Sequence, residues 1–202
     1  NLYHKPALNP DDIMEELKQY KEMIAPYVCD VSLYLWNSLK EGKEILAKAG
    51  ITEADLDAWY LLEFVTGITK ARYYMDPDQS MDPEAWKKYK EYLEKRRNHI
   101  PLQHITGSQE FMGLEFLVNE HVLIPRQDTE TLVEKALEVM KGKKTPGILD
   151  MCTGSGCILL SLLALTGDAY GVGADVSPLA LQVADKNAVS LEVSDRAVFV
   201  ES

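Results

Sequence analysis

A glycine-rich loop and two aspartates carry the chemistry that this sequence could perform. The loop is Asp150-Met151-Cys152-Thr153-Gly154-Ser155-Gly156, and it follows a short apolar run. Its glycines would let the backbone approach a ligand closely, and a helix after the loop would point its amide groups toward that ligand. Asp175 ends the next apolar run, where its carboxylate could accept hydrogen bonds from both hydroxyl groups of a ribose. The spacing therefore predicts a nucleotide site at the ends of two neighbouring strands.

The kind of nucleotide is indicated by patterns that the loop lacks. The dinucleotide pattern Gly-x-Gly-x-x-Gly fails at Leu159 when it starts from Gly154, and the sequence has no Gly-Lys-Ser or Gly-Lys-Thr to form a phosphate loop. The order Asp-x-x-x-Gly-x-Gly is similar to the first motif of class I methyltransferases. Their ligand, S-adenosyl-L-methionine, carries a cationic sulfonium and no phosphate. A tight glycine turn in some other α/β protein is the alternative.

The segment around the loop has the alternation that would place both aspartates at one edge of a sheet. Strands are expected at residues 148–150, 170–174 and 196–200, with helices at 157–165 and 178–189. Strands and helices in this order are typical of a doubly wound parallel sheet. The carboxyl ends of such strands form the ligand crevice.

A β-hairpin is expected before this sheet. Residues 110–118 alternate in β-rich fashion, and a polar Asn119-Glu120 turn leads to a second apolar run at 122–124. A helix should then begin at Asp128 or Thr129, and glycine and proline should end it before residue 147.

The first half of the chain has helical periodicity. Residues 11–24 place apolar side chains on one helical face, and Ser32 could cap the next helix. Thr52-Glu53-Ala54-Asp55 has the form of a capping box for a helix that ends near Gly67. Asp82-Pro83-Glu84 should start another helix, with Trp86, Tyr89 and Leu93 facing inward. We therefore expect a helical extension at residues 1–30, a helical domain at 31–105, and a hairpin with a partial methyltransferase domain at 106–202.

The charge and composition of the chain exclude some classes of binding partner. The 202 residues carry a formal net charge of -11, which argues against direct nucleic-acid binding. The Lys and Arg residues between 87 and 97 alternate with glutamates at helical spacing, which favours a solvated helix face over an RNA groove. No apolar run approaches the roughly 20 residues that cross a bilayer. Three cysteines and four scattered histidines lack metal-ligand spacing, so we expect no metal and a cytoplasmic protein.

Four sequence blocks together resemble one family, the PrmC/HemK peptide-chain-release-factor glutamine N5-methyltransferases. The blocks occur in order over residues 100–107, 110–114, 123–130 and 150–156: Ile-Pro-Leu-Gln-His-Ile-Thr-Gly, Glu-Phe-Met-Gly-Leu, Leu-Ile-Pro-Arg-Gln-Asp-Thr-Glu, and the glycine loop. The resemblance covers about residues 31–202, and its middle blocks are more specific than the loop. It implies S-adenosyl-L-methionine as cofactor, release factors as protein substrate, and a helical domain that docks that substrate.

The resemblance also implies roles for individual residues. Residues 152–156 would wrap the methionine end of the cofactor, with Asp150 before them, and Asp175 would hold the ribose. Phe111 would lie near the cofactor, where a ring attracts a sulfonium, although a place in the hairpin core is an equal alternative. The polar side chains expected to support the site are Arg126, Asp128 and Glu130. For the two acids, a helix N-terminus is the competing explanation.

Two positions depart from the family pattern. Cys152 stands where glycine is common, which raises the question of whether the backbone there needs a positive φ. Gln127 stands where proline is usual, which would loosen the turn without removing a ligand.

The catalytic motif of that family, Asn-Pro-Pro-Tyr, does not occur in these 202 residues. In the family its asparagine and a proline carbonyl orient the substrate amide. We therefore expect an α/β protein made of a helical bundle, a hairpin and the first half of a class I, Rossmann-like sheet, with no catalytic residue of its own. Such a chain alone should bind cofactor weakly, transfer no methyl group, and leave a sheet edge and face uncovered. The alternatives are an N6-adenine-type nucleic-acid methyltransferase and a noncatalytic binding protein with a methyltransferase fold.

Overall fold

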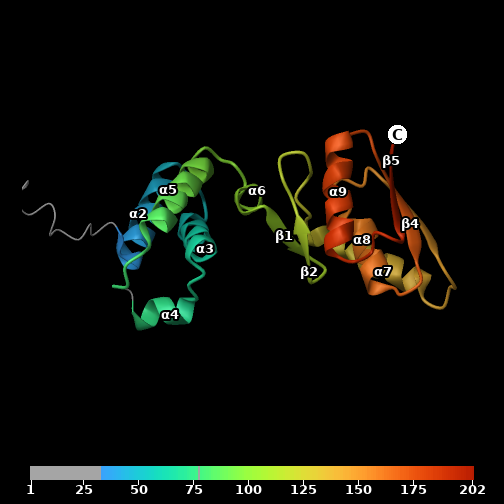
Figure 1. Ribbon diagram of the computed structural model, residues 1–202, viewed down its shortest axis with the longest axis horizontal. Helices are drawn as coiled ribbons and strands as arrows, with labels where there is room; N and C mark the ends of the chain where they lie inside the picture. Colours follow the sequence, from blue (N-terminus) through green and yellow to red (C-terminus); the bar gives the residue numbers. More distant parts are fainter. Residues whose placement is uncertain (1–32, 77) are drawn as a thin grey trace, which may run out of the picture. The chain divides into compact units, whose positions relative to one another are not determined.

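The computed structural model describes residues 33–76 and 78–202 (Figure 1). The expected extension at residues 1–30, its helix at 11–24 and the cap at Ser32 lie outside the described residues. The chain forms two compact units, the first running to Glu94 and the second from Lys95 to Ser202. The domain limits expected from the sequence stay a prediction. None of the described helices is both long and apolar enough to cross a membrane.

The first unit is helical. Its elements are α2 (Leu35–Lys48), α3 (Ala54–Thr66), α4 (Lys70–Met75) and α5 (Pro83–Arg97), the last of which continues into the second unit. The inward-facing side chains expected on α5 are buried: Trp86, Tyr89 and Leu93. Tyr89 contacts both other helices, since its hydroxyl donates to Ala58 O of α3 and its ring lies against Gly42 of α2.

Two helix starts in this unit differ in how well the sequence predicted them. Asp82 caps α5 as expected, because its Oδ1 accepts hydrogen bonds from the backbone N–H groups of Glu84 at 2.9 Å and Ala85 at 3.2 Å. The expected capping box at Thr52 is wrong, since Glu53 is the N-cap residue of α3 and its side chain makes no capping bond. Asp55 instead lies 3.4 Å from the Lys43 ammonium group.

The capping box at Thr52 is absent because α2 ends just before it in a Schellman motif. Gly50 has a φ of +75°, its N–H donates to Ala47 O, and the N–H of Ile51 donates to Leu46 O. Ile51 is thereby buried, and the chain has only two residues left before α3 begins.

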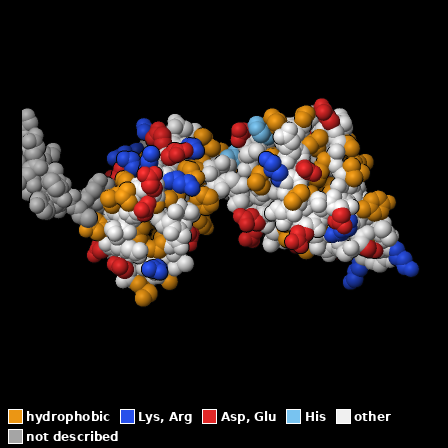
Figure 2. Space-filling view, in the orientation of Figure 1, with side chains coloured by type: hydrophobic (Ala, Val, Ile, Leu, Met, Phe, Trp, Pro, Cys, Tyr) orange, Lys and Arg blue, Asp and Glu red, His pale blue; other side chains and the backbone are white. Residues whose placement is uncertain are grey.

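Lysines of α5 lie over aromatic rings of the same helix. Lys90 Nζ is 5.2 Å from the centroid of the Trp86 ring, and Lys88 Nζ is 5.7 Å from that of Tyr92. Figure 2 shows the basic side chains of this unit interspersed with acidic ones on the visible face. This arrangement agrees with the expected solvated helix face.

The second unit contains a hairpin, a parallel sheet and four helices. The elements are α6 (Leu102–Thr106), β1 (Ser108–Phe111), β2 (Leu114–Leu117), α7 (Gln127–Met140), β3 (Gly147–Met151), α8 (Cys157–Leu165), β4 (Tyr170–Asp175), α9 (Pro178–Ser190) and β5 (Ala197–Glu201). The expected alternation from β3 to β5 is confirmed, and the three strands are parallel in the order β3-β4-β5. The protein is therefore α/β, with the first strands of a Rossmann-like sheet.

The hairpin turn is one place where the expectation was wrong. The turn lies at Met112-Gly113, where φ is +55° and +73°, and not at Asn119-Glu120. Two positive φ values form a type I′ turn, whose twist suits a two-residue hairpin. Residues 122–124 form no strand, because the Asn119 side chain accepts a hydrogen bond from the His121 N–H and turns the chain locally.

One face of the parallel sheet is packed and the other is bare. Helices α8 and α9 lie beside the strands, and Leu159, Leu160 and Leu163 join the hairpin phenylalanines in the main core (Figure 1). Apolar side chains on the opposite face are more than half exposed among the described residues: Leu149, Met151, Tyr170 and Val198. The expected uncovered face is thus present.

The close packing of α2 against α5 gives a testable prediction. A Cβ built at Gly42 would clash with the Tyr89 hydroxyl and lie 3.0 Å from Cζ of the same ring. We expect Gly42→Ala to lower the free energy of unfolding by about 1–3 kcal/mol, although alanine has the better helix propensity by about 1 kcal/mol. Urea unfolding measures the change.

The control for Gly42→Ala is the same substitution in a Tyr89→Phe background, which removes the nearest atom of the clash. The loss should be smaller there, even though Tyr89→Phe also removes the hydrogen bond from its hydroxyl to Ala58 O at 3.1 Å. Equal losses in the two backgrounds would rule out the clash as the cause.

Candidate functional site

The glycine loop between β3 and α8 is held in a left-handed backbone conformation. Cys152, Gly154 and Gly156 have φ values of +62°, +56° and +79°. The Thr153 N–H donates to Ala174 O at 2.9 Å, which ties the loop to the end of β4, and the Gly156 N–H donates back to Thr153 O at 2.8 Å. The loop therefore has one defined shape over the ends of two strands.

The two glycines of the loop serve different purposes. A Cβ at Gly154 would meet nothing within 4 Å, so this residue borders open space where a ligand can approach the backbone. A Cβ at Gly156 would lie 2.8 Å from Leu160 and 3.3 Å from Ala184. Gly156 is thus required for packing the loop onto α8 and α9, while Gly154 leaves the loop accessible.

Asp175 lies at the end of β4, beside the loop. Its Oδ2 accepts a hydrogen bond from the Gly154 N–H at 2.9 Å, and its Oδ1 accepts one from the Ser177 N–H at 3.0 Å. A carboxylate oxygen can accept two hydrogen bonds, so each oxygen keeps capacity for one more donor. The two free lone-pair directions could accept a pair of hydroxyl groups, and the expected contact of Asp175 with a ribose stays a prediction.

Asp150 lies at the end of β3, opposite Gly173 of β4. Burial raises the pKa of its carboxyl group, and the negative charge of Asp175 raises it further, while hydrogen bonds from Thr153 and from the Leu159 backbone partly offset the rise. The Thr153 hydroxyl donates to Asp150 Oδ2 at 2.7 Å. Two neighbouring carboxylates repel a phosphate and attract a cation, so the charges of the site favour a cationic, phosphate-free ligand.

These features fit S-adenosyl-L-methionine. Open space beside Gly154, unused acceptor capacity on Asp175 and two carboxylates near one another match its ribose and its positive charges. The structure brings the expected residues Asp150, 152–156 and Asp175 together at one sheet edge.

Phe111 lies elsewhere in the second unit. Its ring is 1% exposed and belongs to the hydrophobic core, edge-on to Phe116 with 6.1 Å between ring centroids. The structure therefore places Phe111 as a core side chain, and the expected contact with the cofactor stays a prediction.

Of the three side chains expected to support the site, only Glu130 has a hydrogen-bond partner among the described residues. Glu130 Oε1 accepts a hydrogen bond from the Met112 N–H at 2.7 Å, so it holds the tip of the hairpin. Arg126 is the N-cap residue of α7, and Asp128 lies in its first turn. Both are exposed and make no side-chain hydrogen bond or ion pair with the described residues. The positions of Asp128 and Glu130 fit the helix-terminus alternative, because the first turn of a helix favours acidic residues.

One important residue escaped the sequence analysis. Asn187 of α9 is 1% exposed and its side-chain amide bonds to both the hairpin and the glycine loop. A signal was present, because Asn187 sits among Val183, Ala184 and Ala188 on the apolar side of a helix. A polar side chain in that place needs hydrogen-bond partners.

The two described cysteines are unpaired thiols. Cys152 is exposed, and burial raises the pKa of the Cys157 thiol, which makes that thiol a poor nucleophile. No group of three or more potential metal ligands occurs among the described residues.

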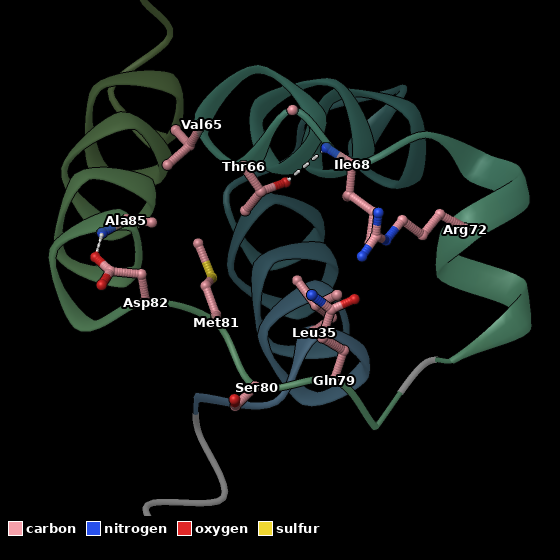
Figure 3. A pocket seen from close by; sticks show the side chains of 11 residues that line it. Leu35, Val65, Thr66, Ile68, Arg72, Gln79, Ser80, Met81, Asp82 and Ala85 are labelled. Carbon is pink, nitrogen blue, oxygen red and sulfur yellow. Dashed lines mark hydrogen bonds between the residues drawn. The ribbon is translucent and has the colours of Figure 1, made fainter.

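The helical unit contains a hollow (Figure 3). Its volume is about 530 Å³, and it is lined by the end of α3, by α4 and by the start of α5. Arg72 and Asp82 are its charged side chains, and Asp82 is engaged in capping α5. Among the lining residues there is no pair suited to acid–base or nucleophilic chemistry.

The raised pKa of Asp150 predicts a pH-dependent stability. A carboxyl group whose pKa is higher in the folded protein contributes stability at low pH, and this contribution is lost as pH rises through the folded pKa. We therefore expect the free energy of unfolding of Asp150→Asn to increase relative to that of the wild type as pH rises from about 4 upward, because only the wild type loses this contribution. Urea unfolding over a pH series measures the difference.

The matched control is Asp185→Asn, which removes the same charge from an exposed position on α9. A pH trend of the same size in both variants would show that net charge, and not the burial of Asp150, causes the effect.

The positive φ at Cys152 gives a second prediction for the site. A β-branched side chain is strained in this conformation, so Cys152→Val should lower the unfolding free energy by about 1–2 kcal/mol. Cys152→Gly relieves the strain but raises the conformational entropy of the unfolded chain. Its free energy of unfolding should therefore lie within about 0.5 kcal/mol of the wild-type value. Met151→Val, one residue earlier in the extended strand β3, is the control and should be tolerated. Equal effects of valine at both positions would contradict the strain.

The sequence matches known proteins in both of its units. A profile of the PrmC N-terminal domain matches residues 37–107. The release factor glutamine methyltransferase of Caulobacter vibrioides is 35% identical over 84% of this chain and 59% of its own length. That of Moorella thermoacetica is 37% identical over 83% of this chain and 59% of its own, and that of Bradyrhizobium diazoefficiens 39% identical over 77% and 53%. The chain thus spans less than two thirds of these relatives.

Among solved structures, an RNA methyltransferase from Salinibacter ruber in complex with S-adenosyl-L-homocysteine is 28% identical. It covers 40% of this chain and 50% of its own, with a TM-score of 0.34, which is too low to carry a conclusion. The sequence blocks, the PrmC N-terminal domain and the curated relatives agree with one another. Residues 37–107 thus match the PrmC N-terminal domain, and about four fifths of the chain is similar to release factor glutamine methyltransferases.

Proposed function

We propose that the protein transfers a methyl group from S-adenosyl-L-methionine to the side-chain nitrogen of a glutamine in a peptide chain release factor. The observation that carries the proposal is the paired geometry of Gly154 and Asp175 in a chain similar to release factor glutamine methyltransferases. The sulfonium of the cofactor supplies the methyl group. The described residues supply the site that binds and orients the cofactor.

Each residue of the loop has a part in that binding. Residues 152–156 present backbone to the methionine end, with Gly154 bordering the open space. Asp175 offers its remaining lone pairs to the ribose hydroxyl groups. Asp150, fixed through Thr153, adds a second negative charge that favours a cationic ligand.

No residue of this site is assigned to the glutamine amide, because Asn-Pro-Pro-Tyr does not occur in the 202 residues. A neutral amide is a weak nucleophile, and its nitrogen needs orientation toward the methyl group. The 202 residues alone are therefore proposed to bind the cofactor and to transfer no methyl group.

The helical unit is proposed to dock the release factor. Its α3 and α4 carry large apolar side chains that are 44–86% exposed, namely Tyr60, Phe64, Tyr74 and Met75. Exposed aromatic and methionine side chains of this kind are typical of protein interaction surfaces. The hollow beside α4, with the Arg72 guanidinium on its wall, adds a concave feature to the same unit (Figure 3). Because release factors act in translation, we place the reaction in the cytoplasm.

The cofactor half of the proposal predicts the effect of removing the Asp175 charge. Asp175→Asn replaces a charge-assisted acceptor by a neutral amide, and should weaken binding of S-adenosyl-L-homocysteine about tenfold or more. Isothermal titration on the 202-residue chain measures the dissociation constant, with urea unfolding to verify the fold. Asp185→Asn is the control for lost charge, and equal weakening in both variants would remove Asp175 from the site.

The substrate half is tested with the protein expressed from its complete gene. Incubation with S-adenosyl-L-methionine and a release factor should add one methyl group to a single glutamine, located by mass spectrometry. Methylation of DNA or RNA in place of the release factor, or of neither, would overturn the proposed substrate.

A further inference from the structure

The hairpin β1–β2 is fixed to the second unit by a polar contact at each end. At its tip, the Met112 N–H donates to Glu130 of α7 at 2.7 Å. At its other end, Leu117 of β2 bonds with Asn187 of α9. Apolar packing of Val118 and Val122 on α9 continues the second contact. The hairpin is thus attached to two helices, one of which also lies beside the glycine loop.

The Asn187 amide replaces a neighbouring strand for Leu117. Its Oδ1 accepts from the Leu117 N–H at 2.7 Å, and its Nδ2 donates to the Leu117 carbonyl at 3.0 Å. Because β1 lies on the other edge of β2, these two backbone groups would otherwise be unpaired. The orientation of the amide is fixed, since an N–H must face an oxygen and a carbonyl must face an NH2 group.

The second hydrogen of the same NH2 group reaches the glycine loop. Asn187 Nδ2 donates to the Ser155 carbonyl at 2.9 Å, and Ser155 is 2% exposed. One planar group therefore joins the hairpin backbone to the loop backbone, and its bond to Ser155 is buried. Moving Ser155 away from its position would leave a buried carbonyl and a buried donor unpaired, which is costly.

We propose that Asn187 is a positioning residue that couples the cofactor loop to the hairpin, so that ligand binding at the loop and order in the hairpin stabilise each other. The ligand part rests on the proposed function, whereas the coupling of loop and hairpin does not. A ligand that binds only the observed loop shape stabilises the Ser155–Asn187 bond, and through the rigid amide the bonds to Leu117. Such coupling is reciprocal, since what the ligand does for the hairpin the hairpin must do for the ligand.

The coupling is tested first without ligand, by amide hydrogen exchange. Asn187→Leu keeps the side-chain size and removes all three bonds, and Asn187→Ala leaves room for water should the leucine variant fail to fold. The reporters are the N–H of Leu117, which bonds to Asn187, and the N–H of Gly156, which bonds to Thr153 O and not to Asn187. We expect both to exchange about tenfold faster or more in the variant.

Val133→Ala is the control, because Val133 is buried in the core on α7 and its loss destabilises the unit without touching the amide. In this control the N–H groups of Leu117 and Gly156 should exchange no faster, relative to other amides of the core, than they do in the wild type. If Asn187 variants speed exchange at Leu117 and leave Gly156 unchanged, Asn187 holds only the hairpin and the proposal is overturned.

The second measurement titrates S-adenosyl-L-homocysteine into each variant at a temperature where all are folded. Asn187→Ala should bind about tenfold more weakly, equivalent to about 1.4 kcal/mol, while Val133→Ala binds as the wild type does. Ligand should also slow exchange at Leu117 in the wild type and have no such effect in Asn187→Ala. Unchanged affinity and exchange in Asn187→Ala would overturn the proposal. If the wild type binds no ligand, the proposed function fails at its cofactor, and the exchange measurement alone decides the coupling.

Discussion

The hydrogen bond from the Gly154 N–H to the Asp175 carboxylate is the interaction on which the site depends. It joins the end of one strand to the loop that leaves its neighbour, and so converts the parallel register of β3 and β4 into a fixed backbone shape. That shape demands positive φ at three positions, only two of which are glycine. The strain at Cys152 is accepted because neighbouring bonds, such as that from Thr153 to Ala174, over-determine the loop.

The sign of the charges follows from the same arrangement. Most helix N-termini below glycine loops favour an anion, because their unpaired N–H groups carry partial positive charge. Here two carboxylates stand at the neighbouring strand ends, and one of them already takes up the Gly154 N–H. The site thus keeps the backbone geometry of a nucleotide loop while its charges favour a cation. It is this combination that separates a sulfonium ligand from a dinucleotide.

The sequence predicted the parallel half of the second unit well, because buried parallel strands are short apolar runs and the helices between them have clear periodicity. It also predicted Asp150, Asp175 and the loop as one site, because strand ends in such a sheet converge. The hairpin turn was predicted in the wrong place. A methionine gives no sign of a positive φ, and the φ of Met112 follows only from the pairing of Phe111 with Leu114. Asn187 was missed because the partners of that amide are backbone groups 70 and 32 residues away. Backbone partners leave no trace in side-chain spacing.

The raised pKa of Asp150 has a consequence for how any cation would enter the site. A positive ligand stabilises the ionised carboxylate, so its arrival would draw off whatever proton the group still holds. At a pH near that pKa, loading the site is then an exchange in which a cation comes in and a fraction of a proton goes out to the buffer. The heat of that exchange would include the ionisation enthalpy of the buffer, so two buffers that differ in this enthalpy would give different heats at that pH.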